Sequence, residues 1–386
     1  MTRVAVVGIG HSRFGKRRDV NVGELAFESI KQAVDDAGVD RTDIGNFVVG
    51  SMGSWYEESL PAVVVGEYAG LGGAGTMRVE AACASGSAAV KVAYNSIASG
   101  ETEIAMAVGV EKMSELDTPT SVELIGRAGS YTWEFENYGM TFPAYYALYA
   151  VAHMNAFGTT KEDLSRVSVK AHRYGAMNPM AHFQNEVTLE KAMGFQTLAW
   201  PLRLYDACPM SDGSATVVLA SEEAARRLTD TPVWIKGMGY SSDSANLSRR
   251  QSYVGLPAAA DASRKAYAMA KASPGDIDVA TVHDCFTIAE LMAYEDLGFC
   301  KKGEASKMVR DGETELGGRI PVNVDGGLLA KGHPIGATGV SMAVEVTRQL
   351  RGEAGRRQAQ IKKGVGLTHN IGGTGHYAYV TVYSRD

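Results

Sequence analysis

The stretch KGHPIGATG, residues Lys331–Gly339, surrounds one histidine, His333, with three glycines and a proline. It leads directly into a segment with helical spacing, Ala337–Arg351. A loop of this composition holds an imidazole in a fixed place and lets a ligand reach the backbone. A histidine that merely caps a helix gives the same local pattern, so the rest of the chain has to distinguish the two interpretations.

An earlier segment is built in the same way. Cys83 stands in EAACASGS, residues Glu80–Ser87, ahead of a helix-like run of small residues, Ala84–Ser99. Strand-like runs match as well: DIGNFVV (Asp43–Val49) with DIDVATV (Asp276–Val282), and Ile104–Val110 with Gly364–Thr368. The matches occur in the same order, which makes chance similarity the weaker explanation. We therefore interpret the chain as two copies of one βα unit, related by an approximate two-fold that brings Cys83 and His333 to one centre.

The alternation of strand-like and helix-like segments predicts an α/β fold with helices on the faces of a sheet. We place the division at an N-terminal half, residues 1–230, and a C-terminal half, residues 231–386. The stretch 114–205 has no counterpart in the second half and is rich in aromatic residues and methionine. We expect it to be a subdomain inserted in the first half, which either covers a substrate pocket or forms a helical layer with its own core.

Composition narrows the class of protein. The 386 residues carry 38 basic and 44 acidic side chains, a formal net charge of −6, which argues against nucleic acid as the main partner. The four cysteines are too few and too scattered for a disulfide framework, and none forms a C-x-x-C pair. No run of about 18 apolar residues is present, and the amino terminus does not resemble a signal peptide, so we expect a cytoplasmic protein.

VVGIG, residues Val6–Gly10, resembles the start of a dinucleotide-binding fingerprint, but Arg13 occupies the place of its third glycine. We therefore reject a dinucleotide site there.

Cys83 is the first candidate for chemistry. A thiol at the start of a helix lies near unpaired N–H groups and the positive end of the helix dipole, which stabilise the reactive thiolate. A buried structural cysteine is the competing interpretation, because free cysteines are usually buried.

The tetrapeptide His283-Asp284-Cys285-Phe286 lies between a predicted strand and a predicted helix, where ligands bind in open α/β sheets. Its thiol could act as a general acid and base, and its imidazole could donate to a carbonyl oxygen. A purely structural role stays open. Metal binding by His283, Cys285 and His333 is a further alternative, but the spacing fits no common site, so we expect no metal.

A glycine-rich link, THNIGGTGH from Thr368 to His376, joins two predicted strands. Its exposed backbone N–H groups could form an oxyanion hole. A tight hairpin needs glycine just as much.

Together, Cys83, HDCF, Gly332-His333-Pro334 and the NIGG segment Asn370–Gly373 resemble the thiolase superfamily. The similarity is strongest to its sterol-carrier-protein-type and archaeal acetyl-CoA acetyltransferase branch, and it covers essentially the whole chain. It implies the thiolase fold: five layers, α-β-α-β-α, in two halves related by a pseudo-two-fold, with a loop domain inserted in the first half.

The sequence departs from most biosynthetic thiolases at two places. Those enzymes carry their acid/base cysteine in the C-terminal glycine-rich loop, where this chain has Asn370, and they have Asn-Glu-Ala-Phe where this chain has HDCF. In the branch that this chain resembles, the relocated cysteine, here Cys285, is taken to do the same work.

The resemblance implies a two-step acyl transfer with no cofactor beyond coenzyme A thioesters. His333 would lower the pKa of Cys83, which takes the acyl group, and Cys285 would remove the α-proton of a second acetyl-CoA. The enolate oxygen would lie against His333 and His283. The tetrahedral oxyanion would lie against the N–H groups of Cys83 and Gly372, with Asn370 in the same substrate-binding loop. We expect the condensation of two acetyl-CoA to acetoacetyl-CoA, on the mevalonate route to isoprenoids.

Other functions share parts of this pattern. A degradative 3-ketoacyl-CoA thiolase for longer or steroid acyl chains is one alternative. A ketosynthase-like enzyme is another, but it would not need Cys285. A retro-aldolase of the same branch dispenses with both thiolase cysteines, which this chain keeps. A lipid-carrier or scaffold subunit would need none of them. The resemblance also implies a homodimer or homotetramer, and a possible complex with 3-hydroxy-3-methylglutaryl-CoA synthase and a small zinc-ribbon/OB-fold protein.

Overall fold

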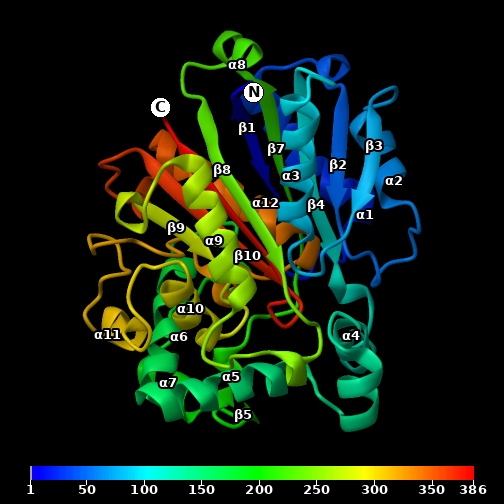
Figure 1. Ribbon diagram of the computed structural model, residues 1–386. Coiled ribbons are helices and arrows are strands. Elements are labelled where there is room, and N and C mark those ends of the chain that lie inside the picture. Colours follow the sequence, from blue (N-terminus) through cyan, green and yellow to red (C-terminus); the bar gives the residue numbers. More distant parts are fainter. Residues whose placement is uncertain (1) are drawn as a thin grey trace.

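A computed structural model describes residues 2–386 (Figure 1). Nine strands follow one another side by side in the order β3-β2-β4-β7-β1-β8-β11-β10-β9. They are β1 (Val4–His11), β2 (Asn46–Gly50), β3 (Gly75–Val79), β4 (Ile104–Lys112), β7 (Asp212–Ser221), β8 (Val233–Ser242), β9 (Val279–Val282), β10 (Val365–Gly372) and β11 (Tyr377–Ser384). The antiparallel pairing between β1 and β8 is short, with Ala5 paired to Trp234 and Val6 to Val233.

On the two sides of the pairing between β1 and β8, the strands follow the same order of pairing types. One side runs β1, β7, β4, β2 and the other β8, β11, β10, β9. The pairings correspond too: the first two are antiparallel and the third is parallel on each side. The matched segments of the sequence become β2 with β9 and β4 with β10, which confirms the interpretation of the chain as two related halves.

Helices form three layers around the two groups of strands. The layer between them consists of α3 (Ser85–Ala98) and α12 (Ile335–Arg351), which pack against each other and against strands of both halves. The outer layers contain α1 (Val22–Ala37), α2 (Pro61–Ala69) and α8 (Glu222–Leu228) on the first half, and α9 (Pro257–Ala270) and α10 (Thr287–Asp296) on the second. Because both faces of the strands are covered, successive residues of β1 alternate between two cores: Val4 and Val6 face the central layer, and Ala5 and Val7 face α1. The five-layered α/β fold is therefore confirmed.

Glycine lets the two central helices approach each other closely. A Cβ atom on Gly86, near the start of α3, would lie 2.7 Å from the carbonyl oxygen of Gly336 at the start of α12. A side chain there would force the helices apart. The two helix N-termini consequently meet at the centre of the molecule, and the residues just ahead of them, Cys83 and His333, meet with them.

The stretch between β4 and β7 forms a separate group of helices, drawn in green tones at the bottom of Figure 1. It contains α4 (Thr118–Gly126), α5 (Phe142–Phe157), α6 (Lys161–Ala176), α7 (Leu189–Gly194), β5 (Thr197–Ala199) and β6 (Leu202–Arg203), and α11 (Ala305–Arg310) of the second half packs on α6. Its aromatic residues share one core with the second half, since Tyr146 and Tyr149 belong to the same buried cluster as Phe286 and Leu291. Within residues 2–386, no helix has the length and apolar character needed to cross a membrane.

Candidate active site

Cys83 lies in the turn that leads into α3, two residues before the helix begins. The residue ahead of it, Ala82, has a φ of 49°, in the left-handed region that residues other than glycine rarely adopt. Strained backbone of this kind clusters at functional sites, where the surrounding fold holds it in place. Cys83 is only 6% exposed, so the turn presents its sulfur to the interior.

Burial, rather than the helix N-terminus, controls the acidity of this thiol. Burial raises the pKa of Cys83 to about 12, and hydrogen bonds from the N–H groups of Gly373 and of Cys83 itself offset only part of that rise. The expectation that the helix start would make Cys83 a ready thiolate is therefore wrong. In the free site Cys83 is a neutral thiol that needs a neighbouring base.

His333 follows a π-helical turn, Gly327–Lys331, and precedes α12 by two residues. Its Nδ1 lies 2.7 Å from the Thr338 hydroxyl, which itself donates to the carbonyl oxygen of Pro334 at 2.9 Å. The Thr338 hydroxyl has one hydrogen, which it donates to Pro334, so it can only accept from His333. Nδ1 of His333 therefore carries the ring hydrogen, and Nε2 carries a lone pair. That Nε2 is buried and has no hydrogen-bond partner among residues 2–386. Burial lowers the pKa of His333 to about 3, so the ring is neutral.

His283 lies directly after β9, and its ring meets that of His333. Burial, with His333 and His369 nearby, lowers the pKa of His283 well below its usual range. One nitrogen of each ring and the sulfur of Cys83 all lie within 4.8 Å of one another. The structure thus brings together three of the four catalytic residues expected from the sequence, from three separate elements.

Asn370, on β10, lies behind these residues. Its amide nitrogen is 3.0 Å from the carbonyl oxygen of Cys83 and 2.9 Å from Nδ1 of His283, and its amide oxygen accepts from the Ser87 hydroxyl at 2.9 Å. Every polar atom of the side chain is engaged by protein. Asn370, which we had expected to contact substrate, therefore has no amide hydrogen left for one.

Cys285 lies between β9 and α10 and is buried. Burial, together with the neighbouring thiol Cys208, raises the pKa of Cys285 well above its usual value. The hydroxyl of Tyr146, from α5, donates to the carbonyl oxygen of Gly373 at 3.4 Å, and its position beside Cys285 partly opposes that rise of the pKa. Tyr146 also stacks on Phe286, with ring centroids 4.6 Å apart. The inserted segment thus supplies a polar contact to the second thiol.

Asp284 fixes the position of the HDCF tetrapeptide. Its buried carboxylate accepts a 2.7 Å hydrogen bond from the N–H of Leu328, in the π-helical turn ahead of His333. The HDCF segment and the loop of His333 are therefore tied together.

Two neighbours of the site were not singled out from the sequence. Cys208 lies next to an antiparallel bridge between Ala207 and Phe286, and its N–H donates to the Cys285 carbonyl oxygen at 3.0 Å. In the glycine-rich link, Gly373 lines the cavity and directs its N–H at Cys83, whereas the expected donor, Gly372, ends β10. Gly373 is therefore a second candidate donor beside Gly372, which stays a prediction.

The candidate metal set also differs from the one weighed on the sequence. Cys83 takes the place of Cys285 beside His283 and His333, and all four cysteines are free thiols. A metal-binding imidazole offers a lone pair to the ion and donates its other N–H to a protein acceptor. His283 does not fit this scheme, because its Nδ1 faces the amide group of Asn370, which donates.

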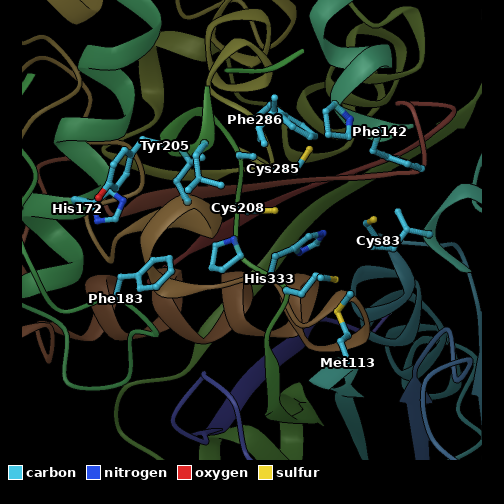
Figure 2. A pocket seen from close by; sticks show the side chains of 18 of the residues that line it. Cys83, Met113, Phe142, His172, Phe183, Tyr205, Cys208, Cys285, Phe286 and His333 are labelled. Carbon is cyan, nitrogen blue, oxygen red and sulfur yellow. The ribbon is translucent and has the colours of Figure 1, made fainter. Parts of the chain in front are cut away.

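A cavity of about 570 Å³ opens beside these residues. Figure 2 shows Cys83 toward one end and His172 and Phe183 toward the other, with Cys285 and His333 between them. Its walls are mainly apolar and include Val122, Ile125, Phe142, Leu198, Leu204 and Leu329. Most of these come from the inserted segment, which therefore covers the cavity as well as packing against the second half.

Known proteins resemble the chain over its full length. Family models match residues 4–223 (thiolase, N-terminal domain) and residues 239–385 (thiolase C-terminal domain-like). An acetyl-CoA acetyltransferase of Methanothermobacter thermautotrophicus is 44% identical, over all of both chains. Human sterol carrier protein 2 is 33% identical, over 99% of this chain and 72% of that protein. A solved Ltp2-ChsH2(DUF35) aldolase is 27% identical with a TM-score of 0.86, over all of this chain and 98% of that one.

Proposed function

Because the chain belongs to the thiolase family and is an acyltransferase, we propose that it condenses two molecules of acetyl-CoA to acetoacetyl-CoA and catalyses the reverse thiolysis. The observation that carries this proposal is a cavity lined by two buried thiols, Cys83 and Cys285, and by the neutral imidazole of His333, against which the ring of His283 packs. A retro-aldolase or a carrier protein has no use for both thiols.

Cys83 is the nucleophile of the first half-reaction. Its proton passes to the free Nε2 of His333 as the sulfur attacks the thioester carbonyl of acetyl-CoA. The oxyanion of the tetrahedral intermediate lies against the N–H groups of Cys83 and of the Gly372–Gly373 segment. Collapse leaves an acetyl group on Cys83, and the departing CoA sulfur takes the proton of Cys285.

Cys285 is the base of the second half-reaction. Now a thiolate, it removes a proton from the methyl group of a second acetyl-CoA. Its raised pKa is an advantage here, because a more basic thiolate removes a carbon-bound proton more readily. The protonated His333 and the ring of His283 lie against the enolate oxygen. The enolate carbon attacks the acetyl group, Cys83 leaves as thiolate, and His333 returns its proton.

The test is thiolysis of acetoacetyl-CoA with free CoA by the wild type, Cys83→Ala, Cys285→Ala and the control Cys300→Ala. Cys300 does not line the cavity. We expect both active-site variants to lose at least about a thousandfold in kcat, and Cys300→Ala to stay within about twofold. Of the two active-site variants, only Cys285→Ala should still become acetylated by acetyl-CoA, because it keeps Cys83. An active Cys285→Ala enzyme would place the base elsewhere and favour ketosynthase-like chemistry.

A thiolase for longer acyl chains is the second candidate, and the size of the cavity favours it. A volume of about 570 Å³ is in the range of pockets that enclose whole drug-sized ligands, far larger than an acetyl group needs. The same assay with 3-ketoacyl-CoA substrates of increasing length distinguishes the two. A kcat/KM that rises with length indicates the degradative activity, and one that falls indicates acetoacetyl-CoA.

We propose acyl-CoA and CoA as the only small-molecule partners, a homodimer or homotetramer, and a cytoplasmic protein of the mevalonate route whose halves divide at residues 230 and 231. The solved protein that resembles this chain is named an Ltp2-ChsH2(DUF35) aldolase, and the DUF35 component in that name supports the proposal of a partner protein. Co-purification with 3-hydroxy-3-methylglutaryl-CoA synthase and a small zinc-ribbon/OB-fold protein would test the complex expected from the resemblance.

A further inference from the structure

We propose that Asn370 is a positioning residue that locks the ring of His283 into the tautomer with its hydrogen on Nε2. His283 then presents an N–H donor, rather than a lone pair, toward the reacting oxygen. The proposal rests on the function proposed above for its catalytic consequence, but the tautomer itself is a property of the free protein.

The orientation of the Asn370 amide is fixed by chemistry. The atom that lies 3.0 Å from the carbonyl oxygen of Cys83 must be the nitrogen, because two acceptor oxygens would repel at that distance. On the other side, the amide oxygen accepts from the hydroxyl of Ser87. A flipped amide would lose the contact with Cys83 and leave two buried oxygens facing each other, which is strongly unfavourable.

The hydrogens of this amide then decide the state of His283. The nitrogen carries two, of which one points to Cys83 and the other to His283 Nδ1, 2.9 Å away. Nδ1 must therefore accept. Since the ring is neutral in its buried place, its hydrogen is on Nε2.

The two histidines are consequently in opposite states. Thr338 makes Nδ1 of His333 a donor and leaves its Nε2 free to accept the proton of Cys83. Asn370 makes Nδ1 of His283 an acceptor, so that Nε2 of His283 carries the hydrogen. The pair thus contains one base and one hydrogen-bond donor from the start of the reaction, with no rearrangement of protons between the rings. A single asparagine serves this purpose because it offers two hydrogens in fixed directions.

The direct test is the ¹⁵N spectrum of the histidine rings in the wild-type protein labelled with ¹⁵N-histidine. The chain has 8 histidines, and His283→Gln identifies the signals of His283 by their loss. We expect a protonated Nε2 and a bare Nδ1 for His283, and the opposite pattern for His333. A hydrogen on Nδ1 of His283 would overturn the proposal, whatever the activity of the enzyme, because this measurement needs no turnover.

The second test compares Asn370→Leu, of similar shape but without hydrogens to donate, with Ser87→Ala, which leaves both amide hydrogens in place. We expect Asn370→Leu to lose the single-tautomer pattern of His283 and to lower kcat for thiolysis by about tenfold or more, with KM changed little. Acetylation of Cys83 by acetyl-CoA should persist. Ser87→Ala should keep the tautomer and a kcat within about threefold. An Asn370→Leu enzyme with wild-type kcat and an unchanged ring pattern contradicts the proposal.

Discussion

The rings of His283 and His333 meet edge to face, with centroids 5.0 Å apart and an angle of 87° between their planes. Two imidazoles can lie this close in a buried site because burial keeps both neutral. Adding a proton to either ring places a charge beside the other, so the site admits one proton at a time. That property determines how the enzyme should respond to pH.

The first prediction concerns the rate at acidic pH. A histidine with a pKa of about 3 stays in its basic form at all pH values above that, so protonation of His333 should not limit kcat/KM between pH 8 and pH 5. We expect a plateau on the acid side of the profile. An inflection near pH 6.5, lost in His333→Gln, would show that His333 titrates like an exposed histidine.

The second prediction concerns stability. Burial lowers the pKa of His369 to about 4, and neither of its ring nitrogens has a hydrogen-bond partner among residues 2–386. Below pH 6.5 the unfolded chain gains a proton at this residue that the folded chain does not, so the free energy of unfolding should fall as pH falls from 6.5 toward 4. At pH 5 the loss is on the order of 2 kcal/mol for each such histidine.

Urea denaturation at pH 7.5 and pH 5.0 measures that loss. His369→Leu should reduce the difference between the two pH values, because the variant has one fewer buried histidine to protonate on unfolding. The same difference in variant and wild type would mean that His369 titrates alike in both states.

The third prediction concerns Tyr146. Tyr146→Phe removes the hydroxyl beside the Cys285 sulfur, which lowers the pKa of that thiol, while keeping the ring that stacks on Phe286. Once Cys285 is a thiolate, the Tyr146 hydroxyl turns from Gly373 to donate to it, and a hydrogen bond to a charged group is worth about 1.5–3 kcal/mol. Without that bond less thiolate forms, so exchange of the α-protons of acetyl-CoA with solvent should slow about tenfold or more. Acetylation of Cys83 should be unchanged. Tyr145→Phe, one residue away on α5, is the matched control, since the Tyr145 hydroxyl donates to Glu134 instead. Equal slowing of acetylation and exchange would point to packing rather than to Cys285.

The fourth prediction concerns the crossing of α3 and α12. A Cβ on Gly339 would overlap the backbone nitrogen of Ser87 and the amide oxygen of Asn370. Gly339→Ala should therefore destabilise the fold by about 1–3 kcal/mol and lower activity as well. Gly194→Ala, where a Cβ meets nothing within 4 Å, should leave both unchanged. Thermal unfolding and thiolysis of the two variants, measured side by side, give the comparison; similar behaviour would show that the helices separate at little cost.

The sequence was sufficient for the features that repeat. Cys83 and His333 could be placed at one centre because each precedes a glycine-containing helix at a matching position in two similar halves. HDCF could be placed nearby because it follows a strand. These inferences depend on periodicity and order, which a sequence displays directly.

The features that depend on burial and on side-chain contacts could not be predicted. The start of a helix just after Cys83 suggested a lowered pKa, but burial raises the pKa of this thiol to about 12. The side-chain amide of Asn370 forms hydrogen bonds with Ser87 on α3, with the backbone of Cys83 and with His283. Tyr146 lies beside Cys285 although it belongs to a helix of the inserted segment. No local pattern contains contacts between such distant segments.

The matching positions of Cys83 and His333, each two residues ahead of its helix, have an evolutionary consequence. In a symmetric pair of identical chains, any residue beside the axis occurs twice, so one gene must encode both copies alike. Two fused halves are free of that constraint, and each copy can mutate independently. One helix start can then carry sulfur and the other nitrogen. Neither half alone encodes the pair, so natural selection acts on the fused gene as one indivisible unit.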